Sequence, residues 1–156
     1  MQNNKTYNIK QATEKIQHYC ALQDRCQWEV KRKLQEYGLD DFVVDSILVD
    51  LILEKFINEQ RFSESFCRGK FRIKKWGKIK IKKELKLKNI SENCIKEGLK
   101  QIEDIEYTKV LENLYRKKRD TLKDKNQFIR KGKISKYLQQ KGFESNLIWE
   151  LINKDK

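Results

Sequence analysis

The chain has 156 residues, with 36 Lys and Arg against 23 Asp and Glu, which gives a formal net charge of +13. Hydrophobic residues make up only 38%, so a core must be assembled from narrow apolar stripes, and no run of 18 apolar residues could span a membrane. Proline is absent, which permits long uninterrupted helices. Residues 1–11 lack an apolar signal segment and are expected to form a flexible end.

The expected first unit, residues 12–58, contains three amphipathic stretches. Val30 and Leu34 are four residues apart, which places them on one helix face, and Gly38 follows after the same interval. Glycine suits the left-handed position that closes a helix, and Asp40 is a natural N-cap for the next one. The remaining apolar positions predict the flanking helices: Ile16, Tyr19, Cys20, Val43, Val44, Ile47, Leu48 and Leu51.

The second unit, residues 59–105, repeats this arrangement at an offset of about 50 residues, a period typical of repeat proteins. Ile81 and Leu85 correspond to the earlier pair, Asn89 takes the glycine position, and Ser91 is the expected N-cap. Residues 78–88 also alternate between apolar and basic side chains, which favours a strand. We expect a helix there, because the equivalent segments of the other two units do not alternate.

The third unit, residues 106–153, has Ile134, Leu138 and Gly142 in the same order. Glu144 is a poor helix cap, so Ser145 is expected to take that role. One unit cannot bury its own stripes, so neighbours must stack. The fold class predicted is therefore all-α: a tandem array of three three-helix repeats, curved and elongated.

Charge is distributed unevenly along these units. Residues 1–60 hold 8 basic and 10 acidic side chains, a net charge of −2, whereas residues 61–105 carry +8 and residues 106–156 carry +7. Repulsion among these basic side chains predicts a polyanionic partner. For each basic residue taken alone, the alternative interpretation is an ordinary solvated surface charge. The candidate binding residues are Arg68, Arg72, Lys74, Lys75, Lys78, Lys82 and Lys83 in the second unit, and Arg116, Lys117, Lys118, Arg119, Arg130, Lys131 and Lys133 in the third.

Three other side chains of the second unit invite a structural interpretation. Arg61 is expected to pair with an acid near a unit junction, and Phe62 is expected in the core rather than as a platform for a nucleic-acid base. Trp76 could stack on a base, but an anchor packed at a repeat junction is the favoured interpretation.

The sequence contains no recognisable catalytic or metal-binding motif. Four cysteines, at positions 20, 26, 67 and 94, lack C-x-x-C spacing, and His18 is the single histidine, so no metal site is expected. The thiols are expected to be reduced, in a cytoplasmic protein, and Cys20, Cys67 and Cys94 are expected to be small core residues. No glycine-rich phosphate loop is present. Asp40, Asp41 and Asp45 suit a helix N-terminus better than a nuclease centre. We expect no catalytic residue and no cofactor.

The order of short motifs resembles the RecX regulatory family. The stretch that carries the resemblance contains Arg61-Phe62, then Trp76-Gly77, then Ile81 with Glu84-Leu85; the third unit adds Tyr137-Leu138 and Gly142-Phe143. The resemblance covers about residues 12 to 153. It departs at Asn89, where glycine is usual, and at Glu59-Gln60, which replace an Asp-rich dipeptide.

The resemblance implies a curved helical array that lies in the groove of RecA–DNA filaments. Such a protein would modulate, and in the main inhibit, RecA ATP hydrolysis and strand exchange, and so regulate DNA repair, recombination and the SOS response. The implied partners are the RecA filament and single- or double-stranded DNA, with no membrane and with a monomer as the working form. The alternative is a stand-alone nucleic-acid-binding module, and an enzyme is the least favoured class.

Overall fold

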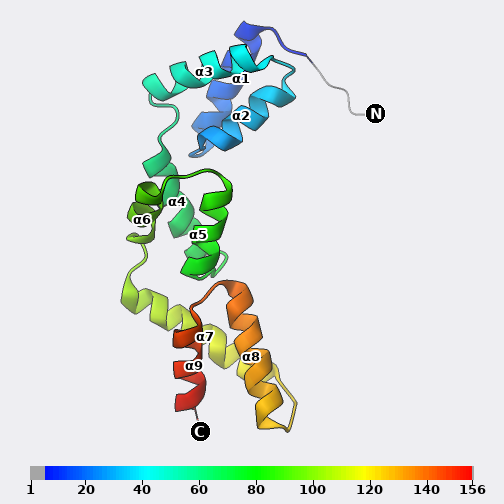
Figure 1. Cartoon of the computed structure of the whole chain (residues 1–156), viewed down its shortest axis with the longest axis vertical. Helices are drawn as coiled ribbons and strands as arrows, with labels where there is room; N and C mark the ends of the chain where they lie inside the picture. Colours follow the sequence, from blue (N-terminus) through cyan, green and yellow to red (C-terminus); the bar gives the residue numbers. More distant parts are fainter. Residues whose placement is uncertain (1–5, 156) are drawn as a thin grey trace.

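The computed structural model describes residues 6–155, and this part of the chain contains nine α-helices and no strand. The all-α prediction is confirmed, and the alternating segment forms α5. The helices are α1 (Ile9–Leu22), α2 (Gln27–Glu36), α3 (Asp41–Leu53), α4 (Glu59–Arg72), α5 (Lys78–Leu87), α6 (Glu92–Leu99), α7 (Asp104–Thr121), α8 (Gln127–Lys141) and α9 (Ser145–Lys154). They form three groups of three that stack end to end into an elongated molecule (Figure 1).

The predicted turns between the second and third helix of each unit are confirmed. Gly38, Asn89 and Gly142 all have left-handed backbone angles, with φ of 82°, 60° and 99°. After two of these turns the chain folds back onto the preceding helix: the N–H groups of Ile90 and Phe143 donate to the carbonyls of Leu85 and Leu138. The last carbonyls of α5 and α8 are thereby satisfied, which fixes where each helix ends.

The caps follow the prediction in two units and differ in the third. Asp40 accepts from the Val43 N–H and Ser91 from the Cys94 N–H, as expected. The N-cap residue of α9 is Glu144, whose side chain makes no capping bond, and Ser145 is the first helical residue. Expecting Ser145 as the cap was therefore wrong. The Glu144 carboxylate instead accepts a hydrogen bond from the hydroxyl of Tyr107.

The first helix begins earlier than the sequence predicts. Asn8 caps α1 through the Gln11 N–H (2.8 Å), and the Gln11 side chain accepts from the Asn8 N–H (3.2 Å). Tyr7 donates its N–H to the Tyr37 carbonyl, and the two rings meet edge to face. The flexible end expected for residues 1–11 is thus wrong for residues 7–11, because this capping box and the Tyr37 contact hold them to the first unit. Residues 1–5 lie outside the described part.

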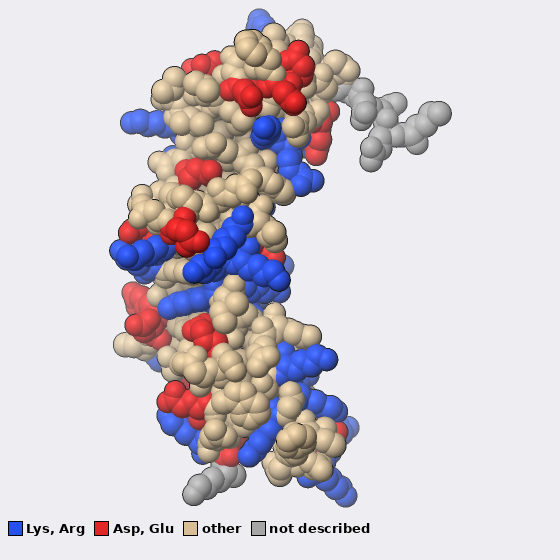
Figure 2. Space-filling view, in the orientation of Figure 1, with Lys and Arg blue, Asp and Glu red and all other residues tan. Residues whose placement is uncertain are grey.

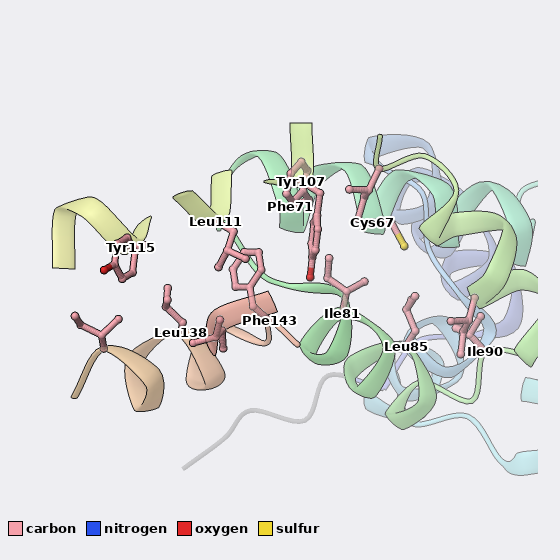
Figure 3. Close-up of a cluster of buried hydrophobic side chains, with 14 of the residues drawn as sticks. Cys67, Phe71, Ile81, Leu85, Ile90, Tyr107, Leu111, Tyr115, Leu138 and Phe143 are labelled. Atoms are coloured by element: carbon pink, nitrogen blue, oxygen red, sulfur yellow. The ribbon is translucent and has the colours of Figure 1, made fainter. Parts of the chain in front are cut away.

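The second and third units share one hydrophobic core. Phe71 packs against Tyr107, and Tyr107 packs against Phe143, with ring centroids 5.8 and 5.1 Å apart (Figure 3). The backbone continues this junction: the N–H groups of Gly77 and Ile79 donate to the carbonyls of Lys141 and Gly142, at 2.8 and 3.0 Å. The positive end of α5 therefore faces the negative end of α8, which is a favourable arrangement of helix dipoles.

The junction between the first and second units is more polar. The first unit has its own core around Ile16, Leu34 and Leu51. Cys26 and the partly buried Trp28 pack against the core of the second unit, and charged groups add further contacts: Arg61 pairs with Asp24 at 2.6 Å and Lys88 with Glu29 at 3.6 Å. The expected role of Arg61 is confirmed.

Candidate functional site

The basic side chains of the second unit come from three consecutive segments. The C-terminal half of α4 carries Arg68 and Arg72, and its connection to α5 carries Lys74 and Lys75. Helix α5 carries Lys78, Lys82 and Lys83. Figure 2 shows Lys and Arg side chains crossing the middle of the molecule and continuing over the third unit, while acidic side chains gather over the first.

Three of these cations are engaged within the protein. The Arg68 guanidinium donates to the Gln101 side chain at 3.0 Å, and Arg72 pairs with Glu106 at 3.9 Å. Lys78 pairs with Asp104 at 3.6 Å. Each contact joins α4 or α5 to the connection after α6 or to the first turn of α7. The two ion pairs lie at the surface and contribute little stability, so a phosphate could replace either acidic partner at small cost.

Four of the candidate lysines of the second unit are exposed and have no such partner. Among the described residues, Lys74, Lys75, Lys82 and Lys83 form no ion pair with an acidic side chain. Lys75 has a φ of 58°, so the chain turns sharply there before α5 begins. We refer to these four residues as the free lysine set. They add uncompensated positive charge to the second unit, which is what a polyanion requires.

A groove of about 980 Å³ lies beside the free lysine set. Helices α5 and α6 and the start of α7 form it, with Ile95, Leu99 and Ile102 at its apolar floor. Lys78 and Lys82 line it, as do Lys96 and Lys100, which the sequence analysis did not select. Their spacing of four residues on α6 was the signal that could have found them. The carboxylates of Glu92, Glu103 and Asp104 line the groove as well, so it presents apolar carbons beside charges of both signs.

The aromatic residues that could have stacked on bases are largely occupied. Phe62 is buried in the core, as expected. Trp76 is partly buried against the core that the second and third units share. The ammonium groups of Lys70 and Lys80 lie 5.0 and 4.4 Å from the Trp76 ring centroid. These contacts favour the interpretation of Trp76 as a junction anchor over a role in base stacking.

In the third unit, several candidate residues serve the local structure. Arg130 donates to the carbonyls of Leu122 and Arg119, at 2.6 and 3.1 Å, and so closes the connection between α7 and α8. Lys133 bonds both carboxylate oxygens of Asp124, at 3.0 and 2.9 Å. These contacts give Arg130 and Lys133 a structural role that sequence spacing could not reveal.

The other candidates of the third unit divide between paired and available side chains. Arg119 pairs with Asp155 at 2.8 Å, and this hydrogen bond raises the pKa of the guanidinium further. Arg116 pairs with Glu112 at 3.6 Å, and the Lys118 ammonium lies over the Tyr137 ring. Lys117 is exposed and Lys131 is half-buried, and neither forms an ion pair within the described part of the chain. The third unit therefore presents fewer available cations than its sequence suggests.

The buried thiols have the character of core residues. Burial raises the pKa of Cys26 to about 12 and that of Cys67 to about 11, so both are protonated at neutral pH. A thiolate is the form that attacks a substrate or binds a metal. Within residues 6–155, no three His, Cys, Asp or Glu side chains come together in a way that could hold a metal ion. In the same part of the chain, no helix is both long and apolar enough to cross a membrane.

Comparison with known proteins gives a consistent picture. Residues 58–99 match the model of the second three-helix domain of RecX, and residues 104–152 match that of its third domain. Together the two matches take in more than half of the chain.

Among curated relatives, a regulatory protein RecX from Haemophilus influenzae (strain PittEE) is 29% identical over 141 residues, which are 90% of this chain and 91% of the relative. A second, from Oceanobacillus iheyensis, is 28% identical over 137 residues, which are 88% of this chain and 50% of the relative. The chain therefore spans about half the length of that protein.

Two solved structures share the fold. The crystal structure of RecX from Lactobacillus salivarius superposes with a TM-score of 0.79 at 24% identity and covers 94% of this chain and 95% of its own. Another regulatory protein RecX gives a TM-score of 0.83 at 23% identity and covers 94% and 73%. The agreement confirms the arrangement of tandem three-helix units.

Proposed function

The chain belongs to the RecX family of regulatory proteins, and from this premise we propose that it binds RecA–DNA filaments in their groove and inhibits their ATP hydrolysis and strand exchange. This activity would regulate DNA repair and recombination. We propose that the protein acts in the cytoplasm, as a monomer in dilute solution, without a cofactor and without an enzymatic activity of its own. The regulatory role is that of the family; the filament, the groove and the inhibition are the proposal.

The observation that carries the proposal is the free lysine set on an elongated array. Lys74, Lys75, Lys82 and Lys83 are exposed and lack acidic partners, in the middle unit of a molecule whose three units lie in a row. An extended surface suits a partner that is itself long and repetitive. Duplex DNA carries one negative charge for about every 1.7 Å of its axis, so several exposed lysines can meet several phosphates at once.

The test is co-sedimentation with RecA–DNA filaments, using charge-reversal variants of matched size. One variant is Lys82→Glu with Lys83→Glu, and a second is Lys74→Glu with Lys75→Glu. The control is Lys10→Glu with Lys109→Glu, which lowers the net charge equally at exposed positions outside the surface. Both test variants should lose filament binding by tenfold or more, on the order expected when two phosphate contacts each give way to repulsion. Binding that survives in the test variants as well as in the control would refute the assignment.

The same lysines would also suit the alternative, a stand-alone nucleic-acid-binding module. Binding to free single-stranded DNA separates the two functions. If the protein binds DNA tightly but leaves the filament's ATP hydrolysis unchanged, the stand-alone module is the correct function. A phosphate-dominated contact should weaken steeply with salt, and each lost phosphate contact should reduce the slope of log K against log salt by about 0.7 on single strands.

A further inference from the structure

Helix α3 is apolar on two opposite sides. Val44, Ile47, Leu48 and Leu51 face the core of the first unit. On the outer side, Phe42, Val49 and Leu53 are 85%, 54% and 74% exposed. Residues seven and four positions apart lie on one face of a helix, so these three share a line along α3, in which Ser46 stands between Phe42 and Val49. Single exposed apolar residues are ordinary on protein surfaces, but an aligned set indicates an interaction site.

Carboxylates border this line on both sides. Asp41 and Asp45 lie on one flank of the line and Asp50 lies on the other, and all three are exposed. We call Phe42, Val49 and Leu53 together with these carboxylates the acidic ridge. Its charge is opposite to that of the rest of the protein, because the first 60 residues carry −2 while the remainder carries +15. A partner for the acidic ridge should therefore offer apolar side chains framed by cations.

The third unit offers such a surface. At the start of α8, Phe128 is 86% exposed and Ile129 is 46% exposed. Lys125 precedes the helix and Lys136 lies two turns further along it; both are exposed. Nothing lies within 4 Å of the place where a Cβ atom of Gly132 would be, so the surface between them is open. We call Phe128, Ile129, Lys125 and Lys136 the basic end.

The two surfaces lie at opposite ends of the elongated molecule. Helix α3 is at the upper end in Figure 1, and the first turn of α8 is at the lower end. One molecule cannot bring its own acidic ridge and basic end together, whereas two molecules can. We propose that copies of this protein associate head to tail, with the acidic ridge of one copy against the basic end of the next.

The symmetry of this contact distinguishes it from an ordinary dimer. Two different surfaces meet, so each copy keeps one surface free and the contact repeats in a line. The association goes beyond the proposed regulatory function and does not require a filament. On a filament, where copies would lie in a row, the same contact would make their binding cooperative; this last consequence rests on the proposed function.

Sedimentation velocity of the purified chain tests the association directly. At high protein concentration and low salt, the wild-type mass should rise continuously past that of a dimer, and it should fall back at high salt, because surface charges are then screened. A mass that stays that of the monomer at high protein concentration and low salt overturns the proposal, and the acidic ridge then serves to bind a different protein. A mass that stops at the dimer also overturns it, since it indicates a symmetric contact.

Charge-swap variants locate the contact. Asp45→Lys with Asp50→Lys reverses the acidic ridge, and Lys125→Glu with Lys136→Glu reverses the basic end. Each variant alone should self-associate about tenfold more weakly than wild type. An equal mixture of the two should associate again, because each reversed surface then meets an opposite charge. The Lys10→Glu, Lys109→Glu control should behave as wild type. Unchanged self-association of the single variants, or a mixture that stays monomeric, would refute the contact.

Discussion

The stacking of the second unit on the third depends on the absence of a side chain at Gly77. A Cβ atom there would lie 2.3 Å from the carbonyl carbon and oxygen of Gly142 and 2.4 Å from the Phe143 nitrogen. The backbone angle of Gly77 is ordinary, with a φ of −76°, so alanine would suffer no conformational strain of its own. Gly77 is also the N-cap residue of α5, where alanine is less favourable than glycine, so the effect of Gly77→Ala combines the overlap between the two units with a smaller loss at the helix end.

The expected loss of stability follows from that contact. Relieving the overlap requires the two backbones to separate by about 1 Å, which strains or breaks the hydrogen bonds from Gly77 and Ile79 to the third unit. Overpacking costs about 1–3 kcal/mol, and each hydrogen bond contributes about 0.5–1.5 kcal/mol, so we expect a loss of about 3 kcal/mol. For a chain of this size the midpoint of thermal unfolding should fall by roughly 6 to 12 °C.

The matched control is Gly132→Ala, inside α8. No atom lies within 4 Å of its Cβ position, so alanine should stabilise the helix by about 0.5–1 kcal/mol. Thermal unfolding followed by circular dichroism compares the two variants. If Gly77→Ala unfolds at the same temperature as Gly132→Ala, the close approach of the second and third units is not as described.

Three further predictions concern individual side chains. Arg61→Ala should destabilise the protein by about 1 kcal/mol, and adding Asp24→Ala should cause no further loss, because the first change already removes the ion pair. Urea unfolding of the two single variants and the double variant measures this; if the two losses simply add, the prediction is wrong. Burial raises the pKa of Glu59, so its charged form opposes folding at neutral pH. Glu59→Gln should therefore stabilise the protein at pH 7, with a gain that shrinks as the pH falls through the raised folded pKa and is gone below the unfolded pKa of about 4.3; a pH-independent effect would argue against burial as the cause. Hydrogen bonds, first of all from the Tyr115 hydroxyl, lower the pKa of Asp155, so its contribution is present above the unfolded pKa of about 3.9 and is lost as the pH falls through the lower folded value. Asp155→Asn should accordingly lower the unfolding midpoint more at pH 7 than at pH 2, and an equal loss at both would refute the assignment.

The repeat could be predicted from the sequence because its determinants are local. Spacing by four residues fixes a helix face, and a residue that tolerates left-handed angles fixes the end of a helix. Gly38, Asn89 and Gly142 satisfy this requirement in every unit. The same reasoning correctly outweighed the strand-like alternation of residues 78–88, since periodicity over a short segment is ambiguous and the repeat supplied independent information.

What the sequence could not predict depends on contacts between distant residues. Glu144 stands at the N-cap position of α9, and its carboxylate accepts a hydrogen bond from the hydroxyl of Tyr107, 37 residues earlier in the chain. Arg130 was selected as a binding residue, but its guanidinium satisfies backbone carbonyls of the preceding connection. Charge composition thus identified the basic units but not the side chains that remain available. Ion pairing divides the second unit into positioning residues and the free lysine set, and only the tertiary structure shows this division.

The most direct test of the proposed regulation is the rate of ATP hydrolysis by RecA filaments on single-stranded DNA, measured as this protein is added. The account predicts inhibition at well below one copy per RecA protomer, retained by the Lys10→Glu, Lys109→Glu control and lost in the Lys82→Glu, Lys83→Glu variant. A rate that stays constant up to equimolar wild-type protein, under conditions where the protein is folded, would contradict it.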